Sequence, residues 1–149
     1  MTEATREEYC DEVLPYSQLD RLLAESDYLV LCVPLTAETR RMIGAAELAQ
    51  MRPTSAIINI ARGSVIDQEA LIAALKDGTI AAAALDVTDP EPLPADSELW
   101  GMENVIITPH VSGAVKGYGH RAAEIFVANL GRWVKGEPLQ QLVSPERGY

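Results

Sequence analysis

Three side chains with complementary chemistry each follow an apolar stretch of the sequence: Arg62, Glu91 and His110. A histidine can act as a general acid or base near neutral pH, and a carboxylate beside it fixes its tautomer and stabilises its protonated form. An arginine presents a planar pair of donors that binds a carboxylate through two hydrogen bonds. Together, the three residue types predict proton transfer beside a bound anionic substrate.

Each of these residues also has an ordinary structural explanation. Arg62 lies beside a glycine and could be a surface or capping residue of a loop, and His110 follows a proline and could be a satisfied loop residue. Glu91 lies between two prolines and could be a solvated loop acid. These alternatives stay open for each residue taken singly, whereas the joint occurrence favours the catalytic interpretation.

The elements that must position the three groups alternate between strand and helix along the chain. Apolar runs predict strands at 28–33, 55–60, 80–85 and 105–108. Helical periodicity and end signals predict helices at 17–25, 45–51, 68–77 and 117–135. Ser17 is the predicted N-cap of the first helix, and Asp67 and Gly78 are the predicted start and stop of the third.

Strands that alternate with helices and are apolar on both faces predict a parallel sheet with helices on each side. Such sheets bind ligands just beyond the carboxyl ends of their strands, which is where the three reactive residues lie in the sequence. The predicted fold class is α/β, a partial doubly wound parallel sheet of Rossmann-like type with a long C-terminal helix at 117–135. With 149 residues and 48% hydrophobic content, the chain is long enough for one core and one domain.

Charge and cysteine content exclude several classes of protein. The formal net charge is -10 with only 12 Lys and Arg residues, which argues against a nucleic-acid partner. No run approaches the roughly 18 apolar residues of a membrane span, and the N-terminus lacks a signal-peptide pattern, so we predict a cytoplasmic protein without membrane contact. Cys10 and Cys32 offer neither a disulfide framework nor zinc spacing, so no metal site is predicted. We expect Cys32 to be a small buried residue of its strand.

Four linked motifs carry a specific resemblance. They are Val33-Pro34-Leu35-Thr36 with Thr39, Asn59-Ile60-Ala61-Arg62-Gly63 with Asp67, Ala84-Leu85-Asp86-Val87 through Pro94, and Asn104-Val105-Ile106-Ile107-Thr108-Pro109-His110. A chain with these motifs in this order resembles the D-isomer-specific 2-hydroxyacid dehydrogenases, in the carboxyl part of their NAD-binding domain. The resemblance runs from about Asp11 to Tyr149.

The resemblance implies an oxidoreductase that transfers a hydride between NAD or NADP and a small 2-oxo or D-2-hydroxy acid. By this resemblance, Arg62 binds the substrate carboxylate and carbonyl, His110 donates a proton to the carbonyl during reduction, and Glu91 pairs with His110. The implied cofactor contacts are Val33, Pro34, Thr39, Ile60, Ala61, Asp86, Ser112 and Gly113. Among them, Asp86 is similar to the residue that accepts a hydrogen bond from the nicotinamide carboxamide. The alternative explanation of Asp86 is an acidic residue in a turn at the end of a strand.

The chain departs from the family's pattern at its start. A complete member has a substrate-binding domain, then a strand, a G-x-G-x-x-G turn and a helix for the pyrophosphate, and none of these precedes Met1. The segment Gly117-Tyr118-Gly119-His120-Arg121-Ala122 fits the glycine pattern, but we reject it because the preceding strand ends too early for a tight turn. We expect residues 1–149 to be the carboxyl portion of an NAD-binding domain, with 117–149 a helix and tail that would cross to an absent substrate domain.

A shortened domain predicts exposed surfaces. The strands at 28–33 and 55–60 are expected to lack a neighbour, and Trp133, Leu139 and Leu142 are expected to lack a partner surface, so a homodimer or a complementing chain is expected. The functional alternative is a catalytically inactive remnant, or a non-enzymatic, corepressor-like binding protein that keeps the fold. The three intact reactive residues favour the enzyme, and the missing pyrophosphate loop favours the alternative.

Overall fold

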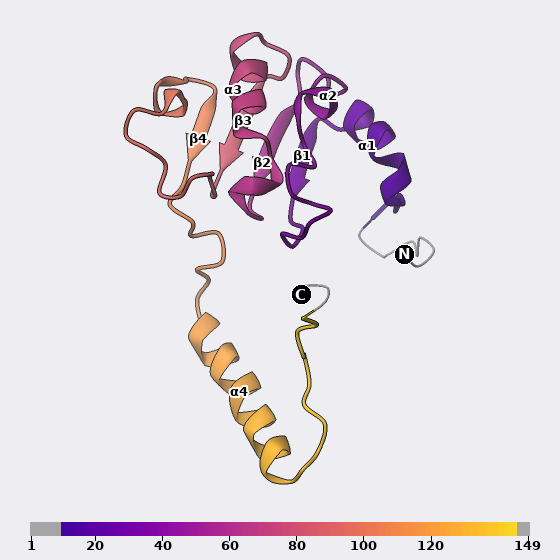
Figure 1. The fold of residues 1–149 in the computed structure, drawn as a ribbon, viewed down its shortest axis with the longest axis vertical. Coiled ribbons are helices and arrows are strands. Elements are labelled where there is room, and N and C mark those ends of the chain that lie inside the picture. The colour runs from indigo at the N-terminus through magenta and orange to yellow at the C-terminus, as the bar shows by residue number, and fades with distance from the viewer. Residues whose placement is uncertain (1–9, 146–149) are drawn as a thin grey trace.

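The structure, a computed structural model, describes residues 10–145 and contains one four-stranded parallel sheet (Figure 1). Its strands lie in the order in which they occur along the chain: β1 (Tyr28–Leu31), β2 (Ala56–Asn59), β3 (Ala82–Leu85) and β4 (Val105–Ile107). The last residues of neighbouring strands pair, with Leu31 opposite Asn59, Asn59 opposite Leu85, and Leu85 opposite Ile107. The loops that follow the four strands therefore all leave the sheet at one edge.

The helices confirm the predicted alternation, with shorter bounds. They are α1 (Leu19–Glu25), α2 (Ala45–Leu48), α3 (Gln68–Lys76) and α4 (Tyr118–Val134), with short 3-10 helices at η1 (Tyr16–Gln18), η2 (Gly63–Val65) and η3 (Glu98–Gly101). Asp67 caps α3 as predicted, since its side chain accepts a hydrogen bond from the Ala70 N–H at 3.3 Å. Gly78 follows α3 with a φ of 70°, a conformation that suits glycine.

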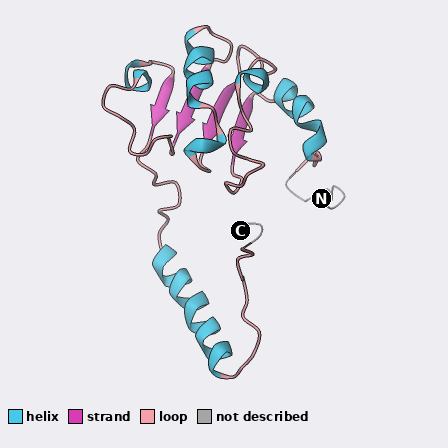
Figure 2. Ribbon diagram, viewed as in Figure 1, coloured by secondary structure: helices cyan, strands magenta, loops and turns pink. Residues whose placement is uncertain are grey.

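One face of the sheet forms the core, and the other is open. Leu29 and Leu31 of β1 are buried while the alternate residue Val30 is 52% exposed, and Ile106 of β4 is 67% exposed on the same open side. Helices α2 and α3 lie against the buried face in Figure 2. The predicted α/β class, a Rossmann-like parallel sheet with a long C-terminal helix, is confirmed, whereas the helices expected on the second face are not found among residues 10–145. Cys32 continues this alternation and is exposed, which corrects its expected burial.

Helix α4 extends away from the sheet and buries none of its residues (Figure 1). The following segment folds back on it: the Asn129 side chain exchanges two hydrogen bonds with the backbone of Gln140, and Arg132 donates to the Pro138 carbonyl. Trp133 and Leu142 are largely exposed, as predicted, whereas Leu139 is half-buried. No helix within residues 10–145 has the length and hydropathy that a membrane crossing needs.

Two further expectations are corrected by local geometry. Two strands were expected to lack a neighbour. Of these two, only β1 does so in the described residues, because β2 pairs with β1 on one side and with β3 on the other. Ser17 does not cap the first helix: the Pro15 carbonyl accepts from the Gln18 N–H at 2.8 Å, so a 3-10 turn precedes α1. The α-helix then begins at Leu19 without a side-chain cap.

Candidate active site

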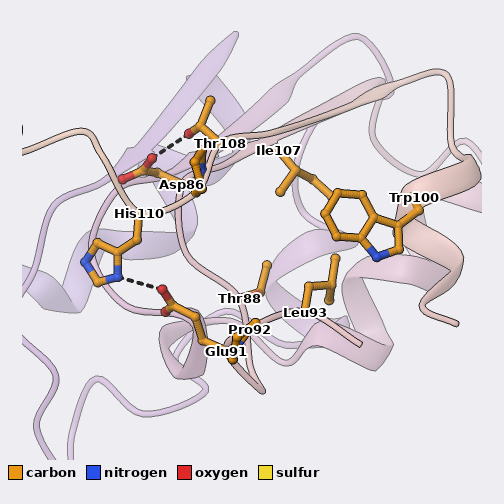
Figure 3. A pocket seen from close by; sticks show the side chains of 10 residues that line it. Asp86, Thr88, Glu91, Pro92, Leu93, Trp100, Ile107, Thr108 and His110 are labelled. Carbon is orange, nitrogen blue, oxygen red and sulfur yellow. Dashed lines mark hydrogen bonds and ion pairs between the residues drawn. The ribbon is translucent and has the colours of Figure 1, made fainter. Parts of the chain in front are cut away.

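The structure brings Glu91 and His110 together at the carboxyl edge of the sheet. The imidazole Nδ1 of His110 lies 2.7 Å from Glu91 Oε1, and both side chains are partly exposed (Figure 3). An ionised carboxylate can only accept hydrogen bonds, so this contact assigns the proton of the neutral ring to Nδ1. The other ring nitrogen, Nε2, is thereby left as the atom that can exchange a proton with a ligand.

His110 has an unusual backbone conformation, with a φ of 53°. This left-handed region costs an ordinary residue roughly 1–2 kcal/mol, so surrounding contacts must hold it. The His110 N–H donates to the Asp86 carbonyl at 2.9 Å. The Asp86 side chain adds three contacts to the same loop: Oδ1 accepts from the Thr108 hydroxyl at 2.5 Å and the Val111 N–H at 2.9 Å, and Oδ2 accepts from the Ser112 N–H at 2.8 Å.

These contacts decide the charge of Asp86. Burial by itself would raise the pKa of the carboxyl group, but hydrogen bonds from Thr108, Ser112 and Val111 outweigh burial and hold the pKa well below its ordinary value of 3.8. The group is therefore ionised at neutral pH. A buried carboxylate stays charged only when donors of this kind surround it.

Arg62 follows β2 and is exposed, and its Nη1 donates to the Ala61 carbonyl at 2.6 Å. Asn59, which is only 1% exposed, shapes this turn: its Oδ1 accepts from the Ala61 N–H at 3.0 Å and its Nδ2 donates to the Arg62 carbonyl at 2.9 Å. Among the described residues, no hydrogen bond or ion pair joins Arg62 to Glu91 or His110. The guanidinium thus lies on the same edge as the pair but separate from it.

Gly63 links the arginine turn to the loop that carries Glu91. A Cβ atom placed on Gly63 would lie 2.0 Å from the Thr88 carbonyl oxygen and 2.6 Å from the Asp89 nitrogen. The two backbones can approach this closely only because Gly63 has no side chain. The position of Arg62 is therefore tied to the start of the segment leading to Glu91.

Two cavities lie on either side of Asp86 and Thr108, which line both. The first has a volume of about 420 Å³ and adjoins the Glu91–His110 pair, with Trp100 on its far wall (Figure 3). The Trp100 indole donates to the Pro94 carbonyl at 2.8 Å, which fixes the ring. The second cavity, of about 290 Å³, lies on the open face of the sheet, and its walls include the sheet residues Ile58, Ile60, Ala84 and Ile106 and the loop residue Ser112.

The predicted cofactor residues all lie in the loops that follow the carboxyl ends of the strands. Val33, Pro34 and Thr39 share the loop after β1, which the Thr39 hydroxyl closes by donating to the Pro34 carbonyl at 2.7 Å. Ile60, Asp86 and Ser112 line the second cavity. Ala61 is buried beside Asn59, and Gly113 is exposed after Ser112; neither lines a described cavity.

Sequence reasoning assigned no role to Asn59, Thr88 or Thr108, although the structure places all three between the reactive loops. Asn59 and Thr88 are buried, and Thr108 is partly buried against Asp86. The sequence feature that could have identified them is an uncharged polar side chain at or just after the end of an apolar strand. Buried polar groups require hydrogen-bond partners, so such residues are expected to organise the loops beside them.

Comparisons of this chain with family models and with known proteins point to the same family. Residues 2–112 match the family model described as D-isomer specific 2-hydroxyacid dehydrogenase, NAD binding domain. Glyoxylate/hydroxypyruvate reductase B of Enterobacter agglomerans is 47% identical over 131 residues, which cover 88% of this chain and 41% of that protein. Glyoxylate reductase of Thermococcus gammatolerans is 46% identical over 144 residues, covering 95% of this chain and 43% of that protein. The chain therefore spans less than half the length of these two relatives.

Solved structures agree with this relationship. A D-isomer specific 2-hydroxyacid dehydrogenase from Xanthobacter autotrophicus, in complex with NADPH and MES, matches 90% of this chain and 55% of its own with a TM-score of 0.84 and 45% identity. An NADPH-dependent glyoxylate/hydroxypyruvate reductase from Sinorhizobium meliloti, in complex with NADP and sulfate, matches 97% of this chain and 47% of its own with a TM-score of 0.85 and 30% identity.

Proposed function

The chain belongs to the D-isomer specific 2-hydroxyacid dehydrogenases, and we propose that it carries the proton-transfer half of a site that interconverts a 2-oxo acid and a D-2-hydroxy acid. The observation that carries this proposal is the 2.7 Å contact between His110 Nδ1 and Glu91 Oε1. A histidine held by a carboxylate is suited to general acid-base catalysis, and its partner stabilises the protonated ring.

In the direction of reduction, protonated His110 gives the Nε2 proton to the carbonyl oxygen of the oxo acid. A nicotinamide held at this edge of the sheet would supply the hydride for the carbonyl carbon. The oxygen gains a proton and the carbon a hydride, so a hydroxy acid forms and a neutral ring remains with its Nδ1–H on Glu91. In the direction of oxidation, the neutral ring accepts the hydroxyl proton instead.

Arg62 is the proposed partner of the substrate carboxylate. Its guanidinium is exposed at the carboxyl edge of the sheet, and it uses Nη1 to bond its own loop. The planar fork can present its remaining donors to the two carboxylate oxygens. This pairing would hold the oxo group in a fixed orientation toward His110.

The lining of the second cavity supports its assignment to a nicotinamide ring. Its walls are mainly apolar, as a flat heterocycle requires, and they include the carboxylate-bearing Asp86, which can accept a hydrogen bond from the carboxamide. We assign the ring and its ribose to Ile60, Ala61, Asp86, Ser112 and Gly113. The loop after β1, with Val33, Pro34 and Thr39, is assigned to the adenosine end of NAD or NADP.

The substrate, organisation and location of the protein follow as parts of the same proposal. The names of the relatives support glyoxylate or hydroxypyruvate as the oxo acid. Residues 1–149 would form the carboxyl portion of the NAD-binding domain, with 117–149 crossing to a substrate domain, although 1–9 and 146–149 lie outside the described residues. The unpacked α4 supports a homodimer or a complementing chain, and a cytoplasmic location stays a prediction. The open sheet face and unpacked α4 also favour a second candidate, a non-enzymatic binding remnant.

A cofactor titration of the purified chain separates the two candidates. NADPH or NADH is added to a Trp133→Phe variant, so that energy transfer to the cofactor reports from Trp100, and oxidation of the cofactor is then followed with glyoxylate and with hydroxypyruvate. The dehydrogenase proposal predicts cofactor binding, and any turnover should be lowered about 10²- to 10⁴-fold in His110→Ala. His120→Ala is the matched control, because that ring is exposed on α4, and its activity should be unchanged. Absence of cofactor binding at millimolar concentration would leave the remnant as the explanation.

A further inference from the structure

Asp86 is the one charged residue among the buried polar side chains of residues 10–145, with 5% of its surface exposed. A buried charge persists only where hydrogen bonds replace its hydration. The donors that do so here all come from one short segment, the loop after β4 that carries His110. The cost of burying this carboxylate is thus offset by contacts that fix the position of that loop.

The contacts enclose His110 on both sides in the sequence. Thr108 donates its hydroxyl to Oδ1 from two residues before the histidine, and the Val111 and Ser112 N–H groups donate to Oδ1 and Oδ2 from the residues after it. The N–H of His110 itself bonds the Asp86 carbonyl at 2.9 Å. One residue therefore accepts four hydrogen bonds from residues 108–112.

This arrangement accounts for the left-handed backbone of His110. The φ of 53° turns the chain sharply between Thr108 and Val111, and a residue with a Cβ is uncommon in this conformation and is stabilised there by neighbouring contacts. Both donors that converge on Oδ1 require that turn, since they come from opposite sides of it. The same turn directs the imidazole toward Glu91.

We propose that Asp86 is a positioning residue for His110, whose ionised side chain holds residues 108–112 in the turn that aims the imidazole at Glu91. This role is separate from a contact with the cofactor, because it needs only groups of this chain. Its consequence for turnover rests on the proposed dehydrogenase function, whereas its consequence for the histidine ring does not.

Asp86→Asn is the decisive substitution. Each carboxylate oxygen accepts a backbone N–H, so an amide placed in either orientation turns its NH2 group against one of those donors. Thr108→Val is a second variant that removes one donor and keeps the side-chain shape. Asp96→Asn is the matched control, since it makes the same chemical change at an exposed position in the loop before η3.

The measurement is the ¹⁵N spectrum of the histidine rings in the full chain, with His110 assigned by the absence of its signals in His110→Ala. In the wild type and in Asp96→Asn, the ring nitrogens should report a proton on Nδ1. In Asp86→Asn this tautomer preference should be lost, and Thr108→Val should weaken it. Where turnover is measurable, kcat should fall about 10²-fold in Asp86→Asn, as expected for a misplacement of about 1 Å, and Thr108→Val should lower kcat by a smaller factor.

The outcomes separate this inference from the proposed function. Retention of the wild-type ring signals in a folded Asp86→Asn protein overturns the inference, as does a wild-type ring without the Nδ1 proton. If circular dichroism shows that Asp86→Asn is unfolded, Thr108→Val decides, with weakened tautomer preference supporting the inference and unchanged signals overturning it. A protein without turnover whose ring signals still respond refutes the dehydrogenase proposal and supports the positioning role.

Discussion

Replacement of Gly63 by alanine tests whether the arginine turn and the glutamate loop are held together by direct backbone contact. The added Cβ would lie 2.0 Å from the Thr88 carbonyl oxygen, 2.1 Å from its carbon and 2.6 Å from the Asp89 nitrogen. All three atoms belong to the backbone, so no side chain can rotate away. To reach the 3.4 Å of an ordinary contact, the two segments must separate by about 1.4 Å.

The expected magnitude follows from this separation. Forcing one extra carbon into a packed site typically costs about 1–3 kcal/mol of unfolding free energy, and Thr88 is buried, so the strain cannot be released into solvent. The displacement also moves Arg62 relative to the loop that carries Glu91. A shift of about 1 Å between reacting groups can lower kcat/KM about 10²-fold.

Urea denaturation followed by circular dichroism measures the stability effect without requiring catalytic activity, and the slope with denaturant should stay unchanged. Gly101→Ala is the matched control, because a Cβ there has no neighbour within 4 Å. It should be neutral or stabilise by up to about 1 kcal/mol through the unfolded chain. A Gly63→Ala protein as stable as the wild type would refute the close contact between Gly63 and the Thr88 backbone.

Two further predictions concern α3 and the buried carboxylate. Asp67→Ala should lower the unfolding free energy by about 0.5–2 kcal/mol, because the Ala70 N–H loses its acceptor. Asp77→Ala, at the opposite end of α3, is the control and should be neutral or slightly stabilising. Thermal denaturation of both variants measures the difference. Because the folded pKa of Asp86 lies below its ordinary value of 3.8, its contribution to stability is complete above that pH and is lost as the pH falls through the folded pKa. Urea denaturation across acid pH should therefore show a shallower decline below pH 3.8 for Asp86→Asn than for the wild type, and equal slopes would contradict this assignment.

Much of the fold follows from local signals in the sequence. The apolar runs around Leu29, Ile57 and Ala83 favour strands that are shielded on at least one face, and the helical segments between them are typical of parallel pairing, which the structure has. The ends of α3 were predictable because Asp67 and Gly78 act through short-range backbone geometry. Such interactions span only a few residues, so the local sequence pattern predicts where the helix begins and ends.

What could not be predicted depends on contacts between distant segments. An exposed Val30 and a buried Leu29 are equally apolar, so the sequence alone does not show which face the described helices cover. Asp86 accepts hydrogen bonds from residues 22 to 26 positions further along the chain, and these bonds depend on the register between β3 and β4. The Glu91–His110 contact was expected only through family resemblance, because a separation of 19 positions, which includes η3 and β4, does not determine a side-chain distance.

The four strands end at paired positions of the sheet, and this limits where the chain can gain or lose residues during evolution. Leu31, Asn59, Leu85 and Ile107 form one paired row, and each loop of the site begins immediately after it. A residue inserted within β3 would reverse which side chains face the core and would move Asp86 off the loop it holds. The segment from Ala114 to Gly117 lies beyond the residues assigned to the site, and it joins the sheet to α4 without belonging to either. Insertions and fusion points should therefore be tolerated in that connection and selected against inside the strands, so natural length variation is expected there.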